Sequence, residues 1–63
     1  MKINEECHSL ILKYFNNDIK ETYLWFNTRN YLLGNVKPIK MIYEGRGKKL
    51  LGFIKSQLEG NFP

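Results

Sequence analysis

The sequence has little of the chemistry with which proteins catalyse reactions or bind metal ions. Its 63 residues contain one cysteine, Cys7, and one histidine, His8. One cysteine excludes an intramolecular disulfide, and a single Cys with a single His leaves a zinc ion short of its usual ligands. Because Cys7 and His8 are neighbours, they point about 100° apart on a helix and do not form a nucleophile–base pair. We therefore expect neither an enzyme nor a protein that binds a metal or another cofactor.

Long apolar stretches are missing as well. No run approaches the roughly 20 residues that a membrane-spanning helix needs. The opening stretch, Met1–Glu6, is too polar for the apolar part of a signal peptide. An unpaired cysteine fits a reducing compartment. The sequence thus predicts a protein that has no contact with a membrane and works in the cytoplasm.

The length allows one domain, covering residues 1–63. A domain of this size buries only about 60% of the surface that its unfolded chain exposes, so its core is small. Since no disulfide can add stability, a second copy or a partner protein is the expected source of further burial. We expect the chain to form a homo-oligomer or a complex.

Charge is unevenly distributed along the chain. Residues 1–28 contain three Lys and four Asp or Glu, a net charge of −1, whereas residues 29–63 contain seven Lys or Arg and two Glu, a net charge of +5. A basic half can bind nucleic acid, but it can also serve only to keep a small domain soluble. No helix-turn-helix is evident, because a long loop separates the second helix from the later ones. A nucleic-acid-binding or co-regulatory module therefore remains an alternative.

Apolar residues recur at helical spacing in four segments, so the sequence predicts an all-α fold, a small bundle of about four helices. Asp18, followed by Glu21 three residues later, is typical of a helix start. Pro38 suits a first helical turn, and Gly45 suits a helix end. The segment between the second and third helices is rich in turn formers and is expected to be a loop. The helices are expected at residues 3–15, 18–27, 38–43 and 46–59.

The same spacing indicates which side chains face the core. One face of the second helix holds Ile19, Thr22, Tyr23 and Phe26, and one face of the third holds Ile39, Ile42 and Tyr43. The second helix is apolar over most of its last turn, which is typical of a buried helix or an interface. A dimerisation module that associates through this helix is a further alternative.

Three residues carry specific expectations about packing. Cys7 lies on the apolar stripe of the first helix and is expected to be a buried thiol. Trp25 is expected to be the largest residue of the core. Gly52 stands inside the last helix, where glycine costs about 1 kcal/mol against alanine. We therefore expect another element to approach the backbone closely at Gly52.

The order of motifs from Phe15 to Gly60 carries a resemblance to a known family. Phe15–Asp18 is followed by Trp25–Asn30, then by Leu33–Ile42, and then by a helix with apolar residues every third or fourth position that ends near Gly60. This order resembles the toxin-binding domain of Xre/MbcA/ParS-type antitoxins, whose pattern runs F-G-D, W-L-x-T-P-N and L-G-G-x-x-P. The resemblance covers about three quarters of the chain and does not include the family's N-terminal helix-turn-helix domain.

The resemblance implies a concrete function. Members of the family bind and neutralise a RES-type toxin that consumes NAD, and their last helix and C-terminal residues block the toxin's NAD pocket. The residues of the motif would then form the loop between helices first and part of the interface second. The implied motif residues are Trp25, Asn30, Leu33, Gly34 and Pro38, and the implied toxin-binding residues are Lys55, Gln57, Leu58, Glu59, Gly60, Asn61, Phe62 and Pro63.

Overall fold

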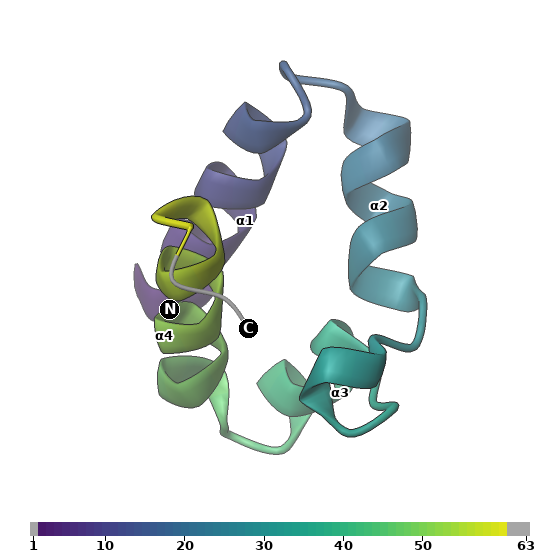
Figure 1. Cartoon of the computed structure of the whole chain (residues 1–63), viewed down its shortest axis with the longest axis vertical. Helices are drawn as coiled ribbons and strands as arrows, with labels where there is room; N and C mark the ends of the chain where they lie inside the picture. The colour runs from purple at the N-terminus through teal and green to yellow at the C-terminus, as the bar shows by residue number, and fades with distance from the viewer. Residues whose placement is uncertain (1, 61–63) are drawn as a thin grey trace.

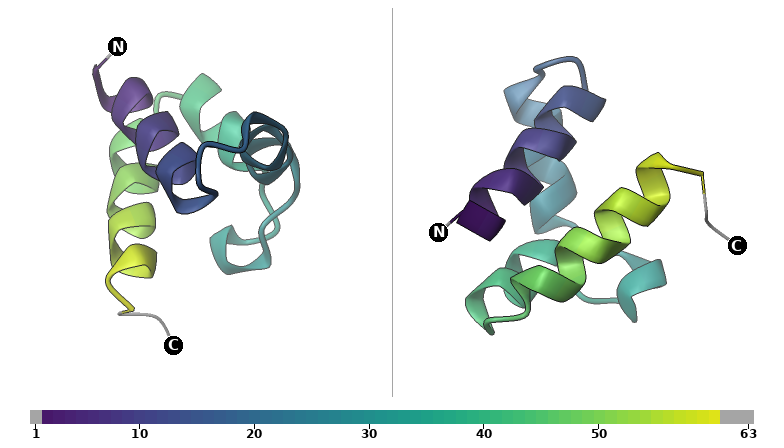
Figure 2. Two further views of the ribbon diagram at one scale, coloured as in Figure 1. Left: turned by 90° about the horizontal axis from the view of Figure 1, so that it is seen from above. Right: turned by 90° about the vertical axis from the view of Figure 1, so that its left-hand side faces the viewer.

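The computed structural model describes residues 2–60, which form four α-helices and one short 3-10 helix. α1 and α4 lie against each other on one side, α2 stands on the other side, and α3 closes one end (Figure 1). Figure 2 shows the same pairing of α1 with α4 from two further directions. The predicted all-α bundle is confirmed, and each predicted helix end lies within one residue of the observed one. The elements are α1 (Lys2–Tyr14), α2 (Ile19–Asn27), η1 (Tyr31–Leu33), α3 (Pro38–Tyr43) and α4 (Gly47–Leu58).

Local sequence chemistry sets the turn between α1 and α2. Asn16 and Asn17 both adopt positive φ angles, 57° and 66°, which asparagine tolerates better than most residues. The backbone N–H of Asn17 donates to the carbonyl of Leu12 over 2.8 Å and closes the helix end. Asp18 then caps α2, because its carboxylate accepts the backbone N–H of Glu21 at 3.0 Å. The predicted helix start at Asp18 is confirmed.

The α3 boundaries also follow the sequence signals. Pro38 occupies the first turn of α3, where its missing N–H costs nothing. At the other end, Gly45 has a φ of 75°, and the N–H of Arg46 donates to the carbonyl of Met41 over 2.8 Å. This is a Schellman ending, in which glycine supplies the left-handed residue.

The segment before α3 is more ordered than the sequence predicted. The Asn30 side chain accepts the backbone N–H of Leu32 at 3.0 Å and caps the short helix η1. The backbone of Asn30 also pairs with Val36 through an N–H···O bond of 3.1 Å. Gly34, with a φ of 81°, turns the chain between them, as the sequence predicted. The expected irregular loop is therefore a closed turn that contains a 3-10 helix.

The core is small and draws on all four α-helices. The expectation that Cys7 is a buried thiol is confirmed. The expectation for Trp25 is confirmed only in part, because Trp25 packs against the core but is half-buried. Its ring meets the neighbouring Phe26 ring edge-on at 5.0 Å, and Phe26 takes the core position instead. The buried apolar residues are Cys7, Ile11, Phe26, Met41, Leu50 and Ile54.

The predicted inner faces of α2 and α3 are partly wrong. Ile19 and Tyr23 in α2 are 75% and 65% exposed, and Tyr43 in α3 is 81% exposed. The two other residues predicted for this face of α2, Thr22 and Phe26, are buried as expected. The Thr22 hydroxyl donates to the carbonyl of Asp18 at 2.8 Å, so its burial leaves no unpaired polar group. The short helices therefore keep some apolar residues exposed, whereas Trp25, Ile39 and Ile42 are partly buried against the core.

The close approach of two helices occurs at Gly47 rather than at Gly52. A Cβ atom added to Gly47 would lie 3.0 Å from Oδ1 of Asn4 and 3.2 Å from Cγ2 of Ile3, both in α1. A Cβ added to Gly52 would meet nothing within 4 Å. Gly52 lies on the exposed side of α4, so the expectation for Gly52 is wrong.

Cys7 gives a test of the core that needs no mutation. Its surface is fully buried, and its thiol faces the carbonyl oxygen of Gly47 at 3.8 Å. Burial, with a smaller contribution from the charge of Glu6, raises the pKa of the Cys7 thiol above its ordinary value of 9.0. Since the thiolate is the reactive form, we expect a thiol reagent to label the native protein at least tenfold more slowly than the urea-unfolded chain at pH 8.

The same pKa shift predicts a loss of stability in alkali. The folded state holds the Cys7 proton more tightly than the unfolded chain, so the stabilisation is complete below pH 9.0 and falls as the pH rises above that value. Urea titrations at pH 8 and pH 10 measure the difference in the free energy of unfolding. The control is Cys7→Ala, which lacks the titrating thiol. In the labelling experiment described above, a native protein that reacts as fast as the urea-unfolded chain would contradict the buried position of the Cys7 thiol.

Candidate functional site

The last turn of α4 contains the residues that the resemblance assigns to toxin binding. Leu58 is 40% exposed and Gln57 is half-buried. Lys55 reaches across to α1, where its Nζ lies 3.4 Å from Oε2 of Glu6. Glu59 and Gly60 end the helix and are exposed. The remaining predicted residues, Asn61, Phe62 and Pro63, lie outside the described residues.

Trp25 and the end of α4 line one shallow groove, although they are far apart in the sequence. The groove, called the Trp25 groove below, has a volume of about 190 Å³ and lies between α1, α2 and α4. Trp25 contributes from α2, and Gln57 and Leu58 contribute from α4. Its other lining residues, Ile11, Tyr14, Phe15 and Ile54, come from α1, its C-terminal end and α4.

Trp25 also lines a second hollow on its other side. This hollow has a volume of about 370 Å³ and includes Leu24, Arg29 and Tyr31. Tyr31 is 76% exposed and Leu24 is 45% exposed. Trp25 thus separates an uncharged groove, which reaches the end of α4, from a mixed hollow beside η1 that also includes Glu21 and Arg29. The sequence pattern did not assign Tyr14, Leu24 or Tyr31 to the groove or the hollow, since nothing local distinguishes an exposed apolar residue from a buried one.

The other four motif residues have structural positions. Asn30 caps η1 and pairs with the loop, and Gly34 supplies its left-handed turn. Leu33 packs against the core, and Pro38 is buried at the start of α3. Asn30 lines the hollow beside Trp25, whereas Leu33, Gly34 and Pro38 line neither hollow. These residues hold the segment that connects α2 to α3, and Trp25 is the motif residue that reaches the end of α4.

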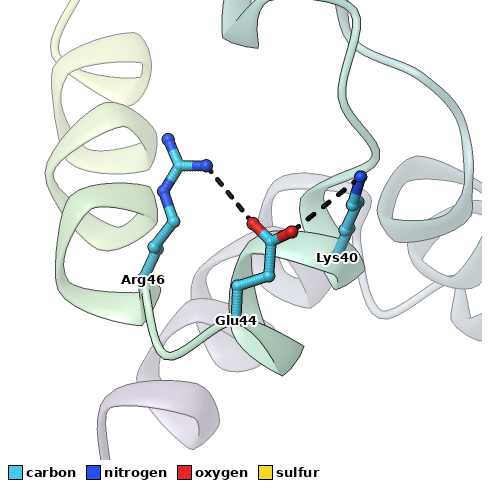
Figure 3. Close-up of polar contacts among 3 residues, drawn as sticks. All are labelled: Lys40, Glu44 and Arg46. Atoms are coloured by element: carbon cyan, nitrogen blue, oxygen red, sulfur yellow. Dashed lines mark hydrogen bonds and ion pairs between the residues drawn. The ribbon is translucent and has the colours of Figure 1, made fainter.

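The basic charge of the second half gathers mainly at the opposite end of α4. Glu44 lies between Lys40, at 3.8 Å, and Arg46, at 3.3 Å, and compensates part of their charge (Figure 3). These pairs are exposed and contribute little stability. Lys48 and Lys49 follow in the first turn of α4 and are exposed. α4 has 12 residues, about 18 Å of helix, so these lysines lie far from the Trp25 groove.

Within residues 2–60, no cluster of three or more His, Cys, Asp or Glu side chains is placed to hold a metal ion. His8 is exposed and stacks on the ring of Phe26 with 6.0 Å between the ring centres. In the same part of the chain, no helix combines the length and apolar character needed to cross a membrane.

Comparison with known proteins gives no match. No model of a protein family, no curated protein and no solved structure matches the chain.

Proposed function

We propose that this chain is an antitoxin-type binding module that neutralises a RES-type, NAD-consuming toxin. In this proposal the last turn of α4 and the residues after it cover the entrance to the toxin's NAD pocket and keep the substrate out. The proposal rests on the motif order from Phe15 to Gly60 and on one structural observation, which is that Trp25 and Leu58 line a common groove.

The groove has the features of a protein-binding surface. Tryptophan and tyrosine dominate the energetics of many interfaces, because they combine a large apolar area with a polar group and little conformational entropy. Trp25 is held at its inner edge by Phe26, and Tyr14, 61% exposed, stands beside it. A preorganised aromatic ring loses less entropy on binding than a free one.

Leu58 is the residue whose change tests the proposal most directly. It lies in the last turn of α4, lines the Trp25 groove and is 40% exposed, so a polar substitution there leaves the core intact. Leu58→Glu would place an unpaired carboxylate inside a dry contact. We expect it to weaken toxin binding at least tenfold, about 1.4 kcal/mol, by the loss of a central apolar contact.

Leu32→Glu is the matched control. Leu32 is also 40% exposed, but it lies in η1 and lines neither Trp25 hollow. The measurement uses a RES-type toxin encoded beside this chain, with binding followed by calorimetry and NAD consumption followed directly. We expect the unaltered chain and Leu32→Glu to stop NAD consumption, and Leu58→Glu to do so only at higher concentration.

Two results would contradict the proposal. The first is a toxin that consumes NAD at full rate in the presence of excess antitoxin chain. The second is a complex that forms and inhibits equally well with Leu58→Glu, which would remove the end of α4 from the contact.

A further inference from the structure

A second apolar groove lies on the other side of α2, between α1, α2 and α3. It has a volume of about 530 Å³, and its floor includes Phe26, Ile39 and Ile42. Ile19, Tyr23 and Tyr43 also line it, and they are 75%, 65% and 81% exposed. The same face therefore carries both a hollow and protruding apolar side chains. We call it the α2–α3 groove.

The charges around the molecule favour a second copy as the occupant. The chain carries a net charge of +4, so two copies repel each other wherever their basic residues face one another. No Lys, Arg, Asp or Glu lines the α2–α3 groove. By contrast, Lys48 lines the hollow at the start of α4, and Glu21 and Arg29 line the hollow beside Tyr31. The polar residues of the lining are Asn4, His8 and Asn27, so two copies can meet over the α2–α3 groove without bringing Lys, Arg, Asp or Glu side chains of its lining together.

The shape of this face also suits association with itself. A two-fold interface uses one surface patch on both subunits, so the patch must be complementary to itself. Here Tyr23 and Tyr43 of one copy can enter the hollow of the other copy, while the corresponding pair enters in return. The Trp25 groove is also uncharged, but it is smaller, about 190 Å³, and is used in the proposed toxin contact.

The exposed side chains of this face supply a large part of the area that a dimer interface needs. From exposures of 75%, 65% and 81%, the side chains of Ile19, Tyr23 and Tyr43 leave about 400 Å² in water per copy, or about 800 Å² for two copies. A stable protein interface buries about 1,200–2,000 Å² in total. These three side chains alone supply roughly two thirds of the lower value, before Ile39 and Ile42 add their exposed parts.

We propose that the α2–α3 groove is the interface of a two-fold homodimer of this chain. The inference is independent of the toxin proposal, because it uses the opposite side of α2. Sedimentation equilibrium from about 1 μM to 1 mM chain measures it directly. We expect the mass to rise from that of one chain to twice that value within this range.

Substitutions from two different helices locate the interface. Ile19→Glu on α2 and Tyr43→Glu on α3 each place two carboxylates in the contact, one per copy, and each should raise the dimer dissociation constant at least tenfold. Tyr31→Glu is the matched control, because Tyr31 is 76% exposed but lies outside the groove, and its dissociation constant should stay within twofold. Circular dichroism confirms that the helices of all three variants are intact.

Three outcomes would overturn the proposal. The first is a chain that remains a monomer at 1 mM. The second is a dimer that survives both groove substitutions. The third is a monomer whose α2–α3 groove becomes protected from hydrogen exchange only when a different protein binds, which would assign this face to that protein.

Discussion

Replacing Leu50 with alanine is expected to destabilise the folded domain by about 2–5 kcal/mol. Leu50 is fully buried in α4, where it belongs to the core cluster with Cys7 and Met41. Truncation removes apolar contacts and leaves a cavity that the surrounding helices fill only in part. A domain of 63 residues has a total stability of roughly 3–9 kcal/mol, so this one change removes a large share of it.

Leu24→Ala is the matched control for this prediction. Leu24 lies inside α2 and is 45% exposed, so the same chemical change there should cost less than about 1 kcal/mol. Urea unfolding followed by circular dichroism gives both values on one scale. Equal costs at the two positions would mean that Leu50 does not lie in the core.

The helix boundaries could be predicted because they depend on local chemistry. The Asp18 carboxylate, the Pro38 ring and the Gly45 backbone each act within a few residues of their own position. The 3-10 helix η1 escaped prediction because it depends on the Asn30–Val36 pair, which closes only when the whole loop is in place. Pattern alone did not distinguish that closed turn from an irregular loop.

The faces of the short helices could not be predicted in the same way. A helix of nine residues such as α2 has too few turns for its spacing to select one apolar face. Ile19 and Tyr23 have the same spacing as buried residues, yet they are exposed because no element covers that side. Similarly, the approach of Trp25 to Leu58 depends on how α4 packs against α1, which the sequence motifs do not encode.

α2 is apolar over most of its last turn, and the two proposals together explain why apolar residues stand on several of its sides. Its inner face, with Thr22 and Phe26, joins the core. Trp25 lies on one flank, in the proposed toxin-binding groove, and Tyr23 lies on the other flank, in the proposed dimer interface. If both proposals hold, a dimer leaves its two Trp25 grooves open and can bind two toxin molecules.

The two glycines of α4 should respond to alanine with opposite signs. Gly52→Ala is expected to stabilise the domain by about 0.5–1 kcal/mol, because the position is exposed, no atom lies within 4 Å of the new Cβ, and alanine favours the helix. Gly47→Ala is expected to destabilise it by about 1–3 kcal/mol. Its Cβ would press on the side chains of Asn4 at 3.0 Å and Ile3 at 3.2 Å, so these tightly packed side chains of α1 must move by a few tenths of an ångström.

Urea unfolding of both variants measures the contrast, and the unaltered chain is the reference for each. Both substitutions add the same methyl group to the same helix, so their difference reports on packing against α1 rather than on composition. Helix propensity also favours a smaller benefit at Gly47. Gly47 lies in the first turn of α4, where replacing glycine with alanine stabilises the helix less than it does at Gly52 in the middle. A stabilised Gly47→Ala variant would contradict the prediction, because the Asn4 and Ile3 side chains would then accommodate the new methyl group without cost.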